Sequence, residues 1–257
     1  MKLARLLLAS VSVAALALAS PSVASADASP ASPTSPAAPA SPAVFEAVPS
    51  ALLSGLSNHA AAFEQMKLRG AFTMDGKVEE VDGDGKVAET KEMKLRVTPR
   101  PAQAPLTEVL RYLENGVDKT EEAREKAANR KPKKDKKEIR MPFLATEQAR
   151  YVFAVVEHDR VHPERVKVSF APKEPAEDAI KGSAWVDTAS SSVLSMGFSL
   201  SKNPTFVDHV DIQLTFGLQT ALGRAPSEIA FDGRGGFLFV HKHYRGKATL
   251  SNARIAF

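Results

Sequence analysis

The C-terminal half of the chain alternates apolar and polar residues over several consecutive segments. Alternation with a period of two places every second side chain on the same face of a strand. These segments therefore predict short antiparallel strands with one apolar face and one polar face. Two of them lie within 181–217, and their apolar positions are Leu194, Met196, Phe198, Leu200, Val210, Ile212, Leu214 and Phe216.

The segment from Pro49 to Gln65 has a longer period and predicts an amphipathic helix. Its apolar residues recur every three or four positions, and Pro49 suits the first turn of a helix. We expect this helix to cover the sheet, either as ordinary core packing or as a lid over a ligand cavity. The apolar positions are Leu52, Leu56, Ala60 and Phe63.

The rest of the chain predicts further strands joined by turns, about ten in all. Asp-Gly pairs at 82–85 predict a hairpin, and Asn115-Gly116 predicts a second turn. Residues 106–113 predict a short helix, and Thr120 precedes a charged helical run. Gly233, Gly235 and Gly236 predict a turn or bulge. A long antiparallel meander of this kind should curve strongly or close on itself to protect its edges.

The N-terminus has the pattern of a cleaved secretory signal peptide over 1–26. Lys2 and Arg5 precede an apolar run of 14 residues, and Ala24-Ser25-Ala26 fits a cleavage site. Residues 27–43 are rich in Pro, Ala and Ser and predict a disordered linker. We therefore expect a single folded domain over 44–257, located in the periplasm.

The chain has no cysteine, so neither disulfides nor a lipid-modified cysteine is available to it. Its net charge is +4. The segment from Lys119 to Arg140 contains ten basic and five acidic residues and so carries a net charge of +5. This leaves a net charge of about −1 for the rest of the chain. Because basic and aromatic residues are not interleaved across a face, no nucleic-acid partner is expected.

Catalytic motifs are missing from the sequence, and we expect no enzyme activity and no cofactor. The Gly-rich run at 233–236 is followed by a strand rather than a helix, so it does not predict a phosphate site. His241 and His243 share a face of a predicted strand, and His209 lies on another. A metal-assisted hydrolase at these histidines is the weakest of three hypotheses, because no carboxylate or cysteine completes a ligand set.

The stretch Gly182-Ser183-Ala184-Trp185-Val186-Asp187 resembles the G-x-x-W-(V/I)-D strand of the LolA-like, outer-membrane lipoprotein-sorting family. The later stretch SKNPTFVDHVDIQLTFG and the ending HKHYRGKATLSNARIAF are similar to the closing strands of that group. Glu114-Asn115-Gly116, before the charged segment, also resembles that group. The resemblance implies an α+β, mainly antiparallel fold: a curved, unclosed β-barrel with the N-terminal helix and other helices on its concave side. A charged insertion at 117–140 departs from the family pattern.

The resemblance also implies a soluble carrier or binding protein for lipid or lipoprotein acyl chains, held in an apolar cavity under the helix. The predicted cavity residues are Leu52, Leu56, Phe63, Leu194, Met196, Phe198, Leu200, Ile212, Leu214 and Phe216. The alternative hypothesis is an envelope sensor or assembly protein that uses the sheet and its basic segment to contact a protein partner, and the basic segment could also contact a membrane surface. The predicted docking residues are Lys131, Lys133, Lys134, Lys136 and Lys137.

Overall fold

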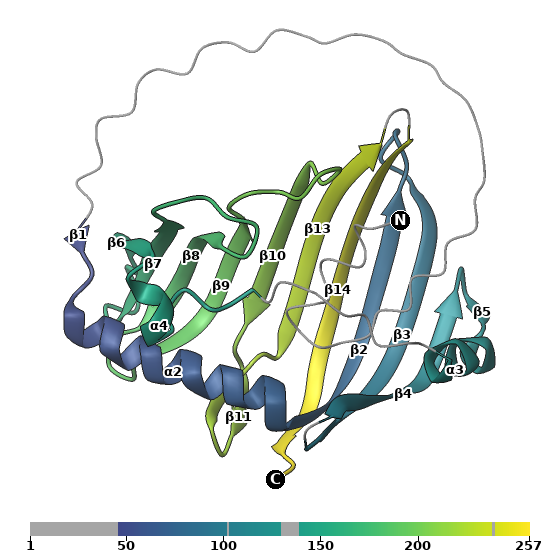
Figure 1. Cartoon of the computed structure of the whole chain (residues 1–257), viewed down its shortest axis with the longest axis horizontal. Helices are drawn as coiled ribbons and strands as arrows, with labels where there is room; N and C mark the ends of the chain where they lie inside the picture. Colours follow the sequence, from purple (N-terminus) through teal and green to yellow (C-terminus); the bar gives the residue numbers. More distant parts are fainter. Residues whose placement is uncertain (1–45, 102, 130–138, 238–239) are drawn as a thin grey trace, which may run out of the picture.

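The computed structural model describes residues 46–101, 103–129, 139–237 and 240–257. Their main feature is a 12-stranded sheet in the order β1-β6-β7-β8-β9-β10-β13-β14-β2-β3-β4-β5, with every neighbouring pair antiparallel (Figure 1). The strands are β1 (Glu46–Ala47), β2 (Gly70–Val81), β3 (Val87–Arg100), β4 (Gln103–Glu114), β5 (Val117–Asp118), β6 (Tyr151–His158), β7 (Arg165–Pro172), β8 (Ile180–Asp187), β9 (Ser192–Leu200), β10 (His209–Thr215), β13 (Glu228–Phe237) and β14 (Val240–Ile255).

The sheet is curved and does not close, because its two outer strands are not paired with each other. β1 and β5 form these edges and contain only 2 residues each. A separate two-stranded ribbon, β11 (Leu218–Thr220) and β12 (Gly223–Ala225), projects from one end of the sheet. The predicted mainly antiparallel, unclosed half-barrel is therefore confirmed.

Within the described residues, three helices accompany the sheet, and they lie on the same side of it in Figure 1. They are α2 (Ser50–Arg69), α3 (Thr120–Ala128) and α4 (Ala145–Gln148). The long helix α2 crosses the strands and leads directly into β2. In the part of the chain that the structure describes, no helix has the length and apolar character needed to cross a membrane.

The predicted helix at Pro49–Gln65 is confirmed, and it continues for one more turn, to Arg69. Its buried residues follow helical spacing, since Leu52, Leu56, Ala60, Phe63 and Met66 all face the sheet. The first four pack in one large core with strands β6 to β10. Buried members of this core on those strands include Val168, Phe170, Val186, Val193, Met196, Leu214 and Phe216.

Two predicted turns are confirmed. Asp82 accepts backbone hydrogen bonds from Asp84 and Lys86 through its carboxylate, closing the hairpin between β2 and β3. Asn115 and Gly116 both have positive φ angles, 50° and 79°, as the tight turn between β4 and β5 requires. The charged helix after Thr120 is also present, as α3.

Two sequence predictions were wrong. Residues 106–113 lie in strand β4, and a register shift opposite Lys94 and Leu95 skips Leu110, which makes the apolar spacing look helical. Gly233, Gly235 and Gly236 lie inside strand β13, not in a turn. Gly233 pairs with Tyr244 in the ladder between β13 and β14, so the missing side chain is compensated by an aromatic neighbour.

Leu56 is fully buried under α2, and Leu68 on the same helix is 67% exposed. Leu56→Ala should lower the free energy of unfolding by about 2–5 kcal/mol, because it leaves a cavity in the core. Leu68→Ala should change it by less than about 0.5 kcal/mol. Chemical denaturation of both variants tests this, and equal losses would show that α2 is not anchored through its inner face.

Candidate functional site

Nearly all of the predicted cavity residues lie in the closed core. Leu52, Leu56, Met196, Phe198, Leu200, Ile212, Leu214 and Phe216 are 8% exposed or less and contact one another across the helix and the sheet. The first part of α2 therefore packs directly on the sheet. Among the described candidates, Phe63 alone also lines an open pocket.

Leu194 departs from the alternation that the sequence predicts. Ser195 pairs with Trp185 and Val193 pairs with Val186, so Leu194 is the extra residue of a bulge between β8 and β9. The bulge turns Val193 into the core, where it is fully buried, and leaves Leu194 only half-buried. A period-two reading of the sequence cannot detect such an insertion.

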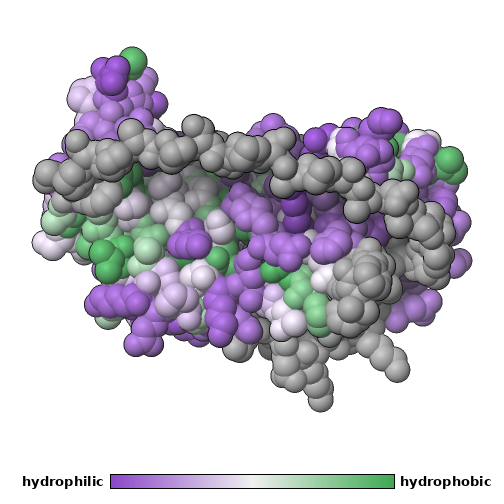
Figure 2. Space-filling view, turned by 90° about the horizontal axis from the view of Figure 1, so that it is seen from above, coloured by the Kyte–Doolittle hydropathy of each residue, from purple (hydrophilic) through white to green (hydrophobic). Residues whose placement is uncertain are grey.

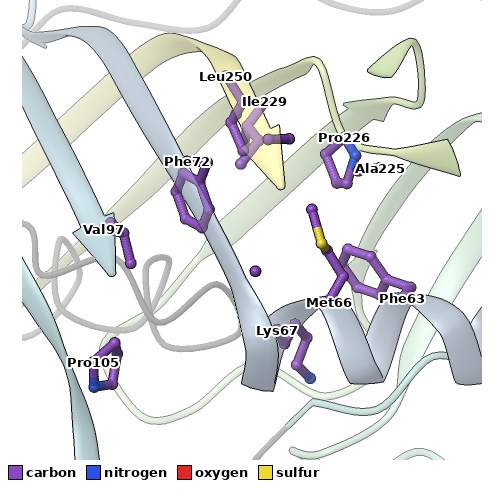
Figure 3. Close-up of a pocket in the computed structure, with 12 residues that line it drawn as sticks. Phe63, Met66, Lys67, Phe72, Val97, Pro105, Ala225, Pro226, Ile229 and Leu250 are labelled. Carbon is purple, nitrogen blue, oxygen red and sulfur yellow. The ribbon is translucent and has the colours of Figure 1, made fainter. Parts of the chain in front are cut away.

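An apolar groove lies at the other end of α2, where the helix meets β2 (Figure 3). Its empty volume is about 590 Å³, including the part open to solvent. Lys67 is the charged member of a lining that is otherwise apolar. The lining residues are Phe63, Met66, Lys67, Gly70, Phe72, Val97, Pro105, Ala225, Pro226, Ile229, Leu250 and Ala253.

The groove runs across the strands rather than along them. Its wall is formed in turn by β4, β3, β2, β14 and β13, which are neighbours in the sheet. The lining of this trough therefore extends over four inter-strand spacings of ~4.8 Å, or about 19 Å of sheet measured across the strands. The last turn of α2 covers one side of this trough through Phe63 and Met66.

The rim of the groove is charged and partly apolar. Lys67 forms an ion pair with Glu64, at 2.7 Å between Nζ and Oε2. Arg69 donates a hydrogen bond to the carbonyl oxygen of Phe257 and lies 5.8 Å from the centre of its ring. The C-terminal residues are thereby tied to the end of α2, next to the groove.

His59 is buried between the core and the groove. Its ring packs edge to face against Phe216, with ring centres 5.4 Å apart, and its Nε2 atom has no hydrogen-bond partner among the described residues. Burial, helped by the positive charge of Arg224, lowers the pKa of His59 to about 4. His59 is therefore neutral at physiological pH.

A second, polar cluster lies on the same face of the sheet, at the far end of β2 and β3. Glu80, Glu89, Lys91 and Glu114 occupy paired positions there, and Tyr244 on β14 pairs with Glu80. Lys91 contacts Glu89 at 2.9 Å, and Lys119 contacts Glu114 at 2.9 Å. Hydrophilic residues prevail at this end of the molecule in Figure 2.

The carboxyl groups of Glu89 and Glu114 share a hydrogen bond, and their pKa values are shifted in opposite directions. Burial raises the pKa of Glu89, and the hydrogen bond from Glu89 lowers the pKa of Glu114. Glu89 is thus the weaker acid of the two. The hydroxyl of Tyr112 lies nearby, is buried and has no partner among the described residues.

The three histidines proposed as metal ligands each face a separate aspartate. His209 contacts Asp211 at 2.5 Å, His243 contacts Asp232 at 2.9 Å, and His241 lies 3.9 Å from Asp208. Within the described ranges, no group of three or more His, Cys, Asp or Glu side chains could hold a metal ion. Each of these histidines therefore lies beside its own aspartate, and no two of them share one.

Several sequence predictions fall outside the described residues. These are the signal peptide, the linker and the docking residues Lys131, Lys133, Lys134, Lys136 and Lys137. The groove itself was missed, because its lining comes from seven separate segments of the chain. Only the apolar alternation of Phe72 and Met74 with polar neighbours could have indicated that β2 has an apolar face.

Comparison with known proteins found no family model and no curated protein that matches the chain. Among solved structures, it is similar to a LolA superfamily protein from Nitrosomonas europaea, with 9% identity, a TM-score of 0.31, and 77% of this chain and 93% of that chain covered. It is also similar to structures of MucB with MucA. One, from Pseudomonas aeruginosa, has 9% identity, a TM-score of 0.24, and 79% and 95% coverage. The other has 10% identity, a TM-score of 0.22, and 79% and 94% coverage.

These values do not show a family. Identities of 9–10% with TM-scores of 0.22–0.31 carry no conclusion about function. The description of the fold therefore rests on the strand order and pairing given above.

Acidification should weaken the fold through His59. The pKa of His59 is about 4 in the folded state, against 6.5 when unperturbed, so the unfolded chain binds the proton more tightly between these values. The contribution of neutral His59 to the free energy of unfolding should be fully present above pH 6.5. The free energy of unfolding should then fall by on the order of 3 kcal/mol as the pH approaches 4.

His59→Leu should remove this part of the pH dependence. His158→Leu, at a side chain that is 62% exposed, is the matched control and should keep it. Urea denaturation at a series of pH values provides the measurement. If His59→Leu and the unmodified protein lose stability equally on acidification, His59 is not buried as a neutral group.

Glu89 should act in the opposite direction to His59. Because burial raises the pKa of Glu89, its contribution to stability is present below 4.5 and is lost as the pH rises through the raised value. Glu89→Gln keeps a donor for Glu114 and cannot ionise. Its stability relative to the unmodified protein should therefore rise with pH, whereas Glu92→Gln, at an exposed position of the same strand, should show no such trend. A trend shared by both variants would contradict the shared proton.

Proposed function

We propose that the protein is an exported, non-catalytic binding or carrier protein for the acyl chains of lipids or lipoproteins. The apolar groove at the end of α2 is the observation that carries this proposal. Its wall of aliphatic, aromatic and proline side chains offers no set of polar groups for a polar ligand. Hydrocarbon is the ligand chemistry that such a lining fits.

The shape of the groove supports the same ligand. A lining that extends over five neighbouring strands and is open to solvent suits an extended chain better than a compact molecule. Each methylene that moves from water into the groove contributes about 0.8 kcal/mol. A long acyl chain can therefore bind with useful affinity without any specific polar contact.

The position of the groove also supports a carrier. The closed core under the first four turns of α2 holds the fold together, and the groove lies beyond it at the end of the helix. A ligand can then enter and leave without opening the core. Export follows from the signal peptide predicted by the N-terminal sequence.

Ala253→Trp tests the proposal by filling the groove without removing a core side chain. Ala253 is half-buried and lines the groove, and the indole should raise the dissociation constant for a fluorescent fatty acid roughly tenfold or more, because overpacking costs about 1–3 kcal/mol. Lipid that co-purifies with the unmodified protein, measured by mass spectrometry, should fall in parallel.

Ala230→Trp is the matched control. Ala230 is also half-buried, but it follows Ile229 on β13 and so faces the opposite side of the sheet. The Ala230→Trp variant should bind the fluorescent fatty acid with the same dissociation constant as the unmodified protein. Absence of any fatty-acid binding by the unmodified protein would contradict the proposed function.

A further inference from the structure

Met66 occupies the central part of the groove. It lies on the last turn of α2, is 7% exposed, and stands between Phe72 and Pro226 in Figure 3. The lining residues on one side of it come from β2, β3 and β4, and those on the other side come from β12 and the start of β13. A chain that filled the whole trough would have to pass the Met66 side chain.

Gly70 provides the space in which Met66 sits. A Cβ atom at position 70 would lie 2.7 Å from the Met66 sulfur and 2.4 Å from its carbonyl oxygen. The backbone of Gly70 is extended, with φ −79° and ψ 126°, which any residue can adopt. Glycine is therefore needed here for its lack of a side chain, not for its backbone freedom.

Methionine is well suited to an adjustable position. Its side chain is unbranched, has three rotatable bonds and packs in many shapes at similar energy. The neighbouring lining residues Phe72, Pro105 and Pro226 are rigid by comparison. Among these side chains of the groove, Met66 is the one that can move or stop an incoming chain.

We propose that Met66 sets the length of acyl chain that the groove accepts, with its thioether, seated over Gly70, as the end stop. The inference rests on the proposed function, and it identifies the residue that determines specificity. A chain fills the groove from the β4 side up to the methionine. Longer chains place their additional methylenes in water.

Binding of saturated fatty acids from caprate to stearate tests this with the full chain. For the unmodified protein, affinity should improve roughly fourfold per methylene, the equivalent of ~0.8 kcal/mol, up to a limiting length and then level off. In Met66→Ala the limit should move to longer chains by roughly three methylenes, the length of the side-chain atoms that alanine lacks. Titration calorimetry gives the limit for each protein.

Gly70→Ala gives the reverse result by a different route. The added methyl would lie 2.7 Å from the sulfur and 2.4 Å from the carbonyl oxygen of Met66, so both the thioether and the end of α2 must shift, and the limit should move to shorter chains. The double variant Met66→Ala with Gly70→Ala removes the contact with the sulfur and keeps the contact with the backbone, so it should recover only the part of the change that is due to the thioether. A merely structural effect of the Gly70 substitution would persist in the double variant.

Met93→Ala is the matched control, since Met93 is also 7% exposed but packs in the smaller core cluster on β3, away from the groove. It should lower the melting temperature without moving the limiting length. If the unmodified protein binds fatty acids and Met66→Ala has the same limiting length, the inference fails and the proposed function stands. If the unmodified protein binds none of these fatty acids, both fail.

Discussion

The packing of the apolar stripe of α2 against strands β6 to β10 is the interaction on which the rest of the structure depends. A helix of 20 residues is about 30 Å long, so it is long enough to cross several strands and to hold them in one layer. Its first part meets a continuous apolar surface and makes a closed core with it. Its last turn leads into β2, and the groove lies at this junction. The first part of α2 therefore stabilises the fold, and its last turn lines the groove that is proposed to bind the ligand.

Much of the fold could be predicted from the sequence, because the relevant signals are local. Helical spacing from Leu52 to Phe63, the Asp-Gly turn at 82–85 and the Asn115-Gly116 turn each act over a few residues. The errors came from bulges and from pairing. Leu110 and Leu194 are extra residues in their strands, which shifts the apparent period, and the glycines at 233–236 are held in β13 by a partner strand. Neither effect is visible in a single segment.

The candidate site was harder to predict than the fold. The sequence pattern identified apolar faces but could not distinguish a face that packs against α2 from a face left open beside it. Met196 and Leu214 satisfy the same alternation as Phe72, yet the first two are core residues and the third lines the groove. What decides between them is the place where α2 ends, at Gly70, whose extended backbone begins β2. Only the assembled structure brings Val97, Ala225 and Leu250 to the same groove.

Cross-linking of a photoactivatable fatty acid, followed by peptide mass spectrometry, tests the central claim most directly. A reactive group near the end of the acyl chain should label peptides that contain Phe63–Phe72, Val97 or Leu250, which surround the groove. Labelling should compete with unlabelled fatty acid and be lost in the variant that fills the groove. Labelling concentrated instead on the strands at 194–216 would contradict the account, because it would place the acyl chain within what the structure shows as a closed core.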